Sequence, residues 1–327
     1  MKILVLGGTK FLGRAAVEAA LERGHELTLF NRGETNPQLF PEVEKLRGDR
    51  TGDLSELDGR RWDAVVDPSG YLPHVVRRSA EALRDSVGRY LFVSSISVYA
   101  DFGTGPSEGS PRAELGDMPA DELLPEYENY GALKALAEDA VWEVLGDRAT
   151  IVRPGLIVGP HDPTGRFTYW PHRVARGGDM VVPAPPERTV QFVDVRDLGR
   201  WMIELLERDD GGAFNATRGG VAWGELIEST RAVTGSDAAP VWIPDEFLAE
   251  QGVGEWMELP MWLADPDWVG MNRADVSRAE AAGLAHRPLE DTIRATLEQA
   301  ETTDDAGLKP ERERELIETW RRGGGDH

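Results

Sequence analysis

Short apolar runs alternate with helical patterns along the first 150 residues of the chain. Residues 3–6, Ile-Leu-Val-Leu, are apolar on both faces, which is typical of a buried parallel strand. Residues 11–22 follow with small and apolar side chains at helical spacing, and Gly24 ends this helix. Further strands are expected at 26–30, 43–47, 64–66, 90–93 and 149–152, and further helices at 73–86 and 132–145.

A strand–helix–strand order that repeats in this way predicts a parallel sheet with helices on both faces. Beyond Gly159 the pattern loosens, and residues 160–190 are rich in proline. We therefore predict an α/β fold with a Rossmann-type, doubly wound parallel sheet and a smaller, mixed substrate-binding region. The Rossmann domain is expected to comprise residues 1–160 with 187–217, and the substrate-binding region residues 161–186 with 218–327.

Charge and cysteine content exclude several classes of function. The chain has 58 acidic and 36 basic residues, a net charge of -22, which argues against a general binder of nucleic acid or of anionic membranes. Cysteine is absent, so disulfides, thiolate metal sites and cysteine nucleophiles are excluded. The six histidines are scattered without a pair at ligand spacing, and no metal is expected.

The sequence predicts neither a membrane span nor a secretion signal. No run approaches the roughly 18 apolar residues that a membrane span needs. The apolar N-terminal stretch ends in Gly7-Gly8 and an amphipathic segment, which favours a buried strand over a signal peptide. We expect a cytoplasmic protein.

A glycine-rich loop connects the first strand to the first helix. Glycines there allow a tight turn and a close approach of a pyrophosphate to the positive end of the helix. The position between strand and helix favours a dinucleotide-binding loop over a mere turn, although Lys10 replaces the usual central glycine. The loop reads Gly7, Gly8, Thr9, Lys10, Phe11, Leu12 and Gly13.

The end of the second strand bears on the choice of dinucleotide. NAD-binding folds usually have an acidic residue there, whereas NADP-binding folds use arginine for the 2′-phosphate. Here Asn31 and Arg32 stand at that position, which favours NADP over NAD, unless Arg32 is an ordinary solvated charge. Asp49, after the third strand, is placed to cap the adenine end or simply to form a turn.

Tyr130 and Lys134 are four residues apart, so a helix places them on one face. An ammonium beside a phenol stabilises the phenolate and lowers its pKa from about 10. Serine hydroxyls at 94 and 95 end the preceding strand and can hydrogen-bond a carbonyl or alcohol oxygen. With a bound nicotinamide, these groups suffice for hydride transfer coupled to proton exchange.

In chain order, these motifs resemble those of the extended short-chain dehydrogenases/reductases, within the NAD-dependent epimerase/dehydratase family. The glycine motif, two adjacent glycines and a third five residues on, is similar to that of an atypical subgroup with reductases and chloroplast RNA-binding proteins. The resemblance covers about two-thirds of the chain. It rests on the glycine loop, 93–99 (VSSISVY), 130–134 (YGALK), 153–160 (RPGLIVGP), 191–197 (QFVDVRD) and 214–217 (FNAT).

The resemblance implies roles for the matched residues. Tyr130 would be the acid/base, Lys134 its pKa-lowering partner and a ligand of the nicotinamide ribose, and Ser95 the hydroxyl that polarises the substrate. Asp67 to Gly70 stand where many relatives carry a proton-relay asparagine. The cofactor contacts expected are Gly7, Gly8, Thr9, Lys10, Phe11, Leu12, Gly13, Asn31, Arg32, Asp49, Pro68, Ser69, Val93, Ser94, Lys134, Pro154, Gly155, Leu156 and Ile157.

We therefore predict an NAD(P)-dependent oxidoreductase that acts on a carbonyl or secondary alcohol. Related sugar 4,6-dehydratases place Asp-Glu after the catalytic serine, whereas this chain has Ile96-Ser97, so dehydration by that route is not expected. Two alternatives stay open: a nucleotide-sugar epimerase that retains its cofactor, and a non-catalytic dinucleotide-binding regulatory or RNA-binding protein. The net charge of -22 disfavours RNA.

The expected partner is a small-molecule substrate, for which a sugar and a nucleotide-sugar are the candidates, and a homodimer is common in the family. Tryptophans 256, 262 and 268 either stack on a substrate ring or belong to a core or subunit interface. His161-Asp162 either faces the substrate or shapes a loop. Arginines that could grip a phosphate or carboxylate, or be solvated partners of acids, are Arg166, Arg173, Arg188 and Arg218.

Overall fold

The computed structural model describes residues 1–300 and 302–325, which divide into two compact units. The second unit includes residues 187–194, because Thr189–Val190 pair with Val221–Ala222. The first unit includes residues 274–285, whose helix α8 (Ser277–Ala281) packs on the strand Gly212–Ala216. The first unit is Met1–Leu156, Val195–Thr217 and Ala274–Ala285, and the second is Ile157–Asp194, Arg218–Arg273 and the chain from His286 onward.

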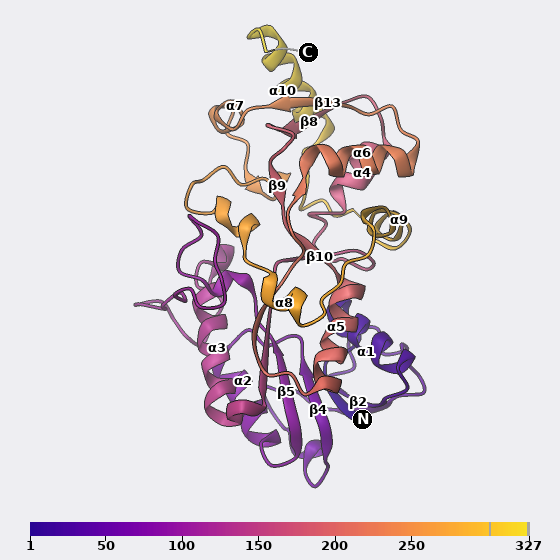
Figure 1. Ribbon diagram of the computed structural model, residues 1–327, viewed down its shortest axis with the longest axis vertical. Coiled ribbons are helices and arrows are strands. Elements are labelled where there is room, and N and C mark those ends of the chain that lie inside the picture. Colours follow the sequence, from indigo (N-terminus) through magenta and orange to yellow (C-terminus); the bar gives the residue numbers. More distant parts are fainter. Residues whose placement is uncertain (301, 326–327) are drawn as a thin grey trace. The chain divides into compact units, whose positions relative to one another are not determined.

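A parallel sheet forms the centre of the first unit (Figure 1). Its strands are β1 (Lys2–Leu6), β2 (Glu26–Asn31), β3 (Glu44–Arg47), β4 (Trp62–Asp67), β5 (Val87–Val93), β6 (Ala149–Pro154) and β11 (Gly212–Ala216). Their order across the sheet is β11-β6-β5-β4-β1-β2-β3, and every neighbouring pair is parallel. The order reverses between β1 and β4, which is the switch point of a Rossmann-like fold. The predicted fold class is therefore confirmed.

Helices cover both faces of this sheet because its central strands are apolar on both sides. α1 (Phe11–Glu22) and α5 (Val195–Arg208) pack together on one face, and α2 (Pro73–Leu83) and α3 (Tyr130–Leu145) on the other (Figure 1). A Cβ at Gly199 would lie 2.8 Å from the backbone of Ala15, so this glycine allows α5 to approach α1 closely.

The second unit is built from short elements around a core of its own. Trp170 and Trp223 are fully buried, and their ring centroids lie 4.6 Å apart. Trp262 is also buried and donates to Asp245, so it belongs to the core, whereas Trp268 is exposed. The elements are α4 (Tyr169–Ala175), β8 (Asp179–Pro183), β9 (Thr189–Val190), β10 (Phe192–Asp194), β12 (Val221–Ala222), α6 (Trp223–Thr234), β13 (Ala239–Ile243), α7 (Asp245–Glu250), β14 (Glu255–Trp256), β15 (Leu259–Pro260), α9 (Leu289–Gln299) and α10 (Pro310–Arg322).

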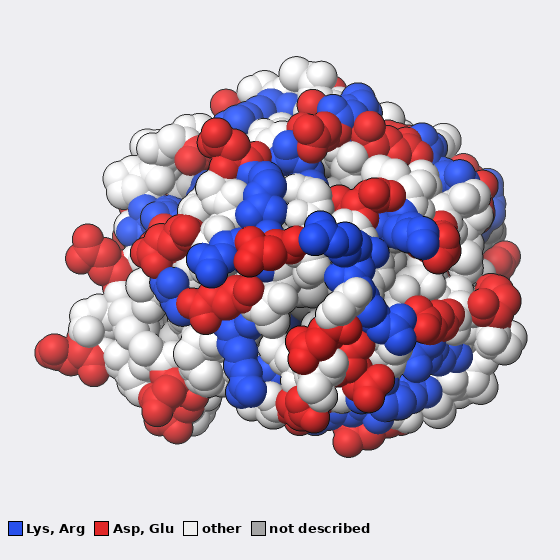
Figure 2. Space-filling view, turned by 90° about the horizontal axis from the view of Figure 1, so that it is seen from below, with Lys and Arg blue, Asp and Glu red and all other residues white. Residues whose placement is uncertain are grey.

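The charged side chains are mixed on the surface that Figure 2 shows. On that face, Lys and Arg are interspersed with Asp and Glu and do not gather into one basic patch. Binding of a nucleic-acid backbone relies on clustered cations, so this face offers little for it. In the part of the chain that the structure describes, no helix is long and apolar enough to cross a membrane.

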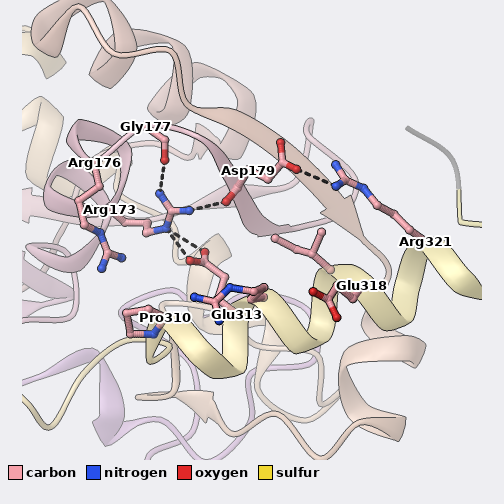
Figure 3. Close-up of a pocket in the computed structure, with 10 residues that line it drawn as sticks. Arg173, Arg176, Gly177, Asp179, Pro310, Glu313, Glu318 and Arg321 are labelled. Carbon is pink, nitrogen blue, oxygen red and sulfur yellow. Dashed lines mark hydrogen bonds and ion pairs between the residues drawn. The ribbon is translucent and has the colours of Figure 1, made fainter.

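A buried ion pair joins α10, the last helix, to the rest of the second unit (Figure 3). The Nε of Arg173 donates to both carboxylate oxygens of Glu313, at 2.9 and 2.7 Å. The other guanidinium nitrogens donate to the carbonyls of Gly177 and Asp179. These residues border a polar pocket of about 350 Å³. All three guanidinium nitrogens of Arg173 thus donate to protein groups, which gives this arginine a structural role.

We expect Glu313→Ala to lower the free energy of unfolding by about 3–5 kcal/mol, because Arg173 would stay buried without a counter-charge. Urea denaturation followed by tryptophan fluorescence measures this loss. The control is Glu318→Ala, an exposed position on the same helix, which should change the unfolding free energy by less than about 0.5 kcal/mol. Equal losses in the two variants would contradict the role of the pair.

Candidate active site

The glycine loop folds as a tight turn between β1 and α1. Gly7 and Gly8 have φ values of +116° and +90°, and a Cβ at Gly8 would lie 2.8 Å from the side chain of Leu29. A Cβ at Gly13 would lie 3.1 Å from the backbone nitrogen of Gly8. Lys10 precedes the helix without capping it through its side chain, and the first turn of α1 carries no acid. The positive end of α1 is therefore suited to an anion.

Asn31 supports this loop from the end of β2. Its side-chain Nδ2 donates to the carbonyl of Gly7 at 2.8 Å. Its Oδ1 accepts from the backbone N–H of Gly33 at 3.0 Å and from the guanidinium of Arg47. The amide of Asn31 thus holds the turn in shape, and Arg47, the last residue of β3, is brought beside it.

Two other residues predicted near the adenosine lie at the same edge of the sheet. Arg32 is exposed, and its guanidinium lies 3.1 Å from the carboxylate of Glu34. Exposed pairs of this kind are weak, so Arg32 is free to turn toward a ligand. Asp49 accepts hydrogen bonds from the backbone N–H and hydroxyl of Thr51, which hold the pKa of Asp49 below its usual value.

Lys134 is buried between the carboxyl ends of β4 and β5. Its Nζ donates to the carbonyls of Gly70 and Val93, each at 2.7 Å. These bonds use two of the three ammonium donors, so one further donor remains. Burial lowers the pKa of Lys134 to about 7, although the carboxylates of Asp67 and Glu138 act in the opposite direction.

Asp67 ends β4 with a fully buried carboxylate. Its two oxygens accept from the two terminal nitrogens of Arg50, each at 2.7 Å, and the hydroxyl of Tyr90 donates to it at 2.8 Å. Burial raises the pKa of Asp67, but the charge and hydrogen bonds of Arg50 outweigh it and hold that pKa below its usual value. Asp67 also accepts from the N–H of Ser69 at 3.4 Å, and so shapes the turn that presents Gly70 to Lys134.

Gly131 brings Tyr130 and Ser95 to the same region. A Cβ at Gly131 would collide with the backbone carbonyl oxygen of Ser97, so only glycine lets the start of α3 pack on the short helical turn 96–98. Ser95 caps the start of that turn. Its Oγ accepts from the N–H of Ser97 at 3.1 Å and donates to the Ser97 hydroxyl at 3.0 Å. Tyr130, the first residue of α3, is half-buried.

Two hydroxyls at strand ends on either side of β6 are buried without a protein partner among the described residues. They are the Oγ of Ser94, after β5, and the Oγ1 of Thr217, after β11. Between these strands, a Cβ at Gly155, after Pro154 of β6, would lie 2.9 Å from the Thr217 hydroxyl. Such unpaired polar atoms are rare and point to a ligand that completes them.

Two of the remaining predicted contacts lie directly after β4, and two lie in a short strand outside the central sheet. Pro68 and Ser69 belong to the turn after β4, where the Ser69 hydroxyl donates to the carbonyl of Leu6 at 3.4 Å. Leu156 and Ile157 lie in β7 (Leu156–Val158), where the chain passes from the first unit to the second.

A second buried network supports α3 one turn beyond Lys134. Arg153 donates to both oxygens of Glu138, from Nε at 2.9 Å and Nη2 at 2.6 Å, and to the hydroxyl of Tyr99 at 2.9 Å. The Tyr99 hydroxyl in turn donates to Asn215 Oδ1 at 2.5 Å. Arg153 and Asn215, one from each of the 153–160 and 214–217 motifs, thus hold α3 in place.

The other arginines predicted as ligand grips belong to the second unit. Arg188 forms a two-bond pair with Asp245, so its guanidinium is already engaged. Arg166 lies over the ring of Trp256 at 5.0 Å, and Arg218 over that of Phe192 at 5.7 Å. The Asp162 carboxylate accepts from the N–H and hydroxyl of Thr164, and thereby shapes its own loop.

The site residues that sequence reasoning missed are Arg47, Arg50, Asp67, Gly131 and Thr217. Two of them carried a visible signal. Asp67 places an acid at the end of a strand that is otherwise apolar, and a buried acid requires a partner. Gly131 places a glycine in the first turn of a helix, directly after the tyrosine, at a cost that close packing explains.

The first unit is thus Rossmann-like, with a glycine loop after β1 and with Ser95 and Lys134 near the carboxyl ends of its strands. Residues 73–217 match the model of the NAD dependent epimerase/dehydratase family. This is the family that the sequence motifs resemble, and the matched segment carries all of those motifs except the glycine loop.

Two relatives and one solved structure are similar to this chain. The chain is 28% identical over 223 residues to the chloroplast stem-loop binding protein of 41 kDa b of Arabidopsis thaliana, covering 63% of this chain and 55% of that protein. It is 27% identical to 2′-dehydrokanamycin reductase of Streptomyces kanamyceticus, covering 77% of this chain and 72% of that enzyme. The structure resembles UDP-glucuronic acid 4-epimerase of Bacillus cereus in complex with NAD, with a TM-score of 0.61 and 18% identity, covering 90% and 97% of the two chains.

We expect Gly131→Ala to reduce stability by about 1–3 kcal/mol, because the added methyl meets the backbone carbonyl of Ser97, which cannot move aside as a side chain can. Thermal unfolding measures this loss. Gly109→Ala is the matched control, since its Cβ would meet no atom within 4 Å. If both variants unfolded at the same temperature, the packing of α3 on residues 96–98 would not require glycine.

Lys134 should make stability depend on pH. Between about pH 7 and the ordinary lysine pKa of 10.5, the unfolded chain keeps the Lys134 proton while the folded chain has released it. This group therefore raises the free energy of unfolding as pH rises, by up to about 1.4 kcal/mol per pH unit. Lys134→Met removes the cost of burying this charge, so the variant should be more stable than the wild type at low pH. Because the stability of the wild type rises with pH and this contribution is absent from the variant, the difference should shrink as pH rises. A constant difference from about pH 6 to 10 would contradict a buried lysine with a lowered pKa.

Proposed function

We propose that the chain is an NAD(P)-dependent oxidoreductase that acts on a carbonyl or a secondary alcohol. The observation that carries the proposal is the buried ammonium of Lys134, one helical turn after Tyr130, at the sheet edge that also holds the glycine loop. The match of residues 73–217 to the epimerase/dehydratase family supports it, and so does the relative named as a reductase.

The described residues fit a dinucleotide. The turn at Gly7 and Gly8 and the uncapped start of α1 suit a pyrophosphate, and the unpaired hydroxyls of Ser94 and Thr217 suit the nicotinamide end. When bound, the nicotinamide supplies or accepts the hydride. The remaining donor of Lys134 is available to a ribose hydroxyl.

The proton chemistry falls to the chain's own side chains. Lys134 as an ammonium favours the phenolate of Tyr130, so the Tyr130 oxygen can take a proton from an alcohol or return it to a carbonyl oxygen. The hydroxyl of Ser95 donates to that same substrate oxygen and stabilises the charge that develops on it. Burial of the ammonium strengthens its effect, because the local dielectric constant is low.

We further propose NADP as the preferred dinucleotide. β2 ends without an acid to accept from a ribose 2′-hydroxyl, and two cations, Arg32 and Arg47, lie at the ends of β2 and β3. Guanidinium groups hold phosphate through paired donors, so they suit a 2′-phosphate. The solved neighbour was crystallised with NAD, and NAD remains the alternative.

A nucleotide-sugar epimerase with a retained cofactor is the second candidate. The likeness to UDP-glucuronic acid 4-epimerase favours it, although at 18% identity this likeness establishes the fold alone. Such an enzyme would hold NAD through purification and would release no reduced dinucleotide during turnover. RNA binding has one relative in its favour, and the net charge of -22 opposes it.

The first experiment is thermal unfolding with NADP⁺, NADPH, NAD⁺ and NADH. A ligand at about 100 times its Kd stabilises the chain by about 2.7 kcal/mol, and we expect this for the NADP pair. Arg32→Ala combined with Arg47→Ala should remove the preference for NADP and leave the response to NAD. Tyr130→Phe should keep the thermal shift and lose about 10²–10⁴-fold in the turnover of carbonyl substrates. The absence of any dinucleotide shift in cofactor-free protein would refute the proposed function.

A further inference from the structure

Two exposed tyrosines flank Tyr130 in the first unit. The ring centroid of Tyr71 lies 6.2 Å from that of Tyr130, with the planes tilted by 45°. The ring centroid of Tyr127 lies 6.0 Å from that of Tyr130, and the two ring planes meet edge to face at 87°. Tyr71 is nevertheless 50% exposed and Tyr127 63% exposed. Large aromatic rings that stay exposed beside a reacting group offer flat apolar faces to a ligand.

Tyr71 is placed by the same contacts that place Lys134. It follows Gly70, whose carbonyl accepts from the Lys134 ammonium, and this ammonium lies 5.7 Å from the centroid of the Tyr71 ring. Burial and the nearby phenol of Tyr127 raise the pKa of Tyr71. The ring is therefore neutral at physiological pH and behaves as an apolar face with a polar tip.

Tyr127 is placed by a pinned loop. The buried side chain of Asn129 donates to the carbonyls of Pro119 and Glu122, each at 2.9 Å. Its Oδ1 accepts from the N–H of Leu124 at 3.0 Å, and the carbonyl of Leu124 accepts from the N–H of Tyr127 at 3.2 Å. The loop before α3 thus has a fixed course up to Tyr130.

The backbone of Tyr127 is strained. Its φ of +64° lies in the left-handed region, which costs a bulky residue about 1–2 kcal/mol. The exposed ring regains little of this by burial. Strain that the surrounding structure imposes on an exposed side chain is typical of functional sites.

The segment that carries Tyr127 is strongly acidic. Residues 113–133 contain no lysine or arginine. Carboxylates on this segment therefore make the approach to Tyr130 unfavourable for an anion and favourable for a cation. Its exposed acids are Glu114, Asp117, Asp121, Glu122 and Glu128.

We propose that Tyr71 and Tyr127 form a substrate subsite, the tyrosine pair, which holds a neutral or amine-bearing ring against Tyr130. The proposal rests on the oxidoreductase function proposed above, since it places the ring that bears the reacting hydroxyl or carbonyl. The C–H face of the ring packs on the phenol rings, and an ammonium substituent gains from the aromatic faces and the acidic segment. An open-chain substrate lacks the flat face, and an anionic one meets like charge.

Four probes of graded shape and charge test the tyrosine pair. Glucosamine, glucose and glucuronate share one ring and differ in charge, and sorbitol is the open-chain control. Binding is measured by saturation-transfer NMR on Tyr130→Phe with NADP⁺ present and absent, which keeps the ring of residue 130 and needs no turnover. We expect the order glucosamine, glucose, then glucuronate and sorbitol, with about tenfold between the ends of the series.

Variants of the pair assign the effect to the rings. Tyr71→Leu and Tyr127→Asn remove one ring each, and asparagine tolerates the left-handed backbone at 127. Each should weaken glucosamine binding by about threefold to tenfold, without a lower melting temperature in either variant. Tyr71→Phe and Tyr127→Phe keep the rings and should bind normally.

The outcomes separate the tyrosine pair from the proposed function. Equal binding of all four probes, no binding of any, or normal binding by the ring-less variants would overturn the subsite while leaving a dinucleotide response intact. Ring-dependent binding without any dinucleotide response would keep the subsite and refute the oxidoreductase.

Discussion

The buried carboxylate of Asp67 holds together the elements at the carboxyl edge of the central sheet. A lone carboxylate at that depth would cost far more than a folded domain can spare, so it exists only with the paired donors of Arg50 and the hydroxyl of Tyr90. These bonds join the loop after β3 to β4 and β5. Through the turn at Ser69 and Gly70, the same carboxylate sets where the ammonium of Lys134 lies.

The fold of the first unit could be predicted from sequence because its signals are local. Helix α1 has the predicted bounds, and the strands expected at 64–66 and 90–93 lie within β4 and β5, because a sheet buried on both faces leaves unbroken apolar runs. The second unit could not be predicted in this way. Its strand β8 pairs with β13, some 60 residues further along the chain, and short elements interrupted by proline give no periodic pattern.

The same difference between local and long-range signals applies to the residues of the candidate site. The glycine loop and the spacing of Tyr130 and Lys134 are visible in the sequence because each is a local motif with a chemical purpose. The pairing of Arg50 with Asp67, and the contact that Gly131 permits with Ser97, join segments that only the folded chain brings together. The two kinds of cation are used differently: arginine forms the buried structural pairs through its planar fork of donors, whereas position 134 has a lysine, whose compact ammonium donates to two backbone carbonyls.

The pair of Arg173 and Glu313 has a consequence for the order in which the protein is made. Its partners are 140 residues apart, and the strand β11 likewise joins the first sheet only after a long detour through the second unit. A ribosome adds about 5–20 residues per second, so Arg173 waits several seconds for its carboxylate. During translation the second unit thus lacks α10, and Arg173 lacks its counter-charge. The core of this unit can be completed only when the last helix has left the exit tunnel.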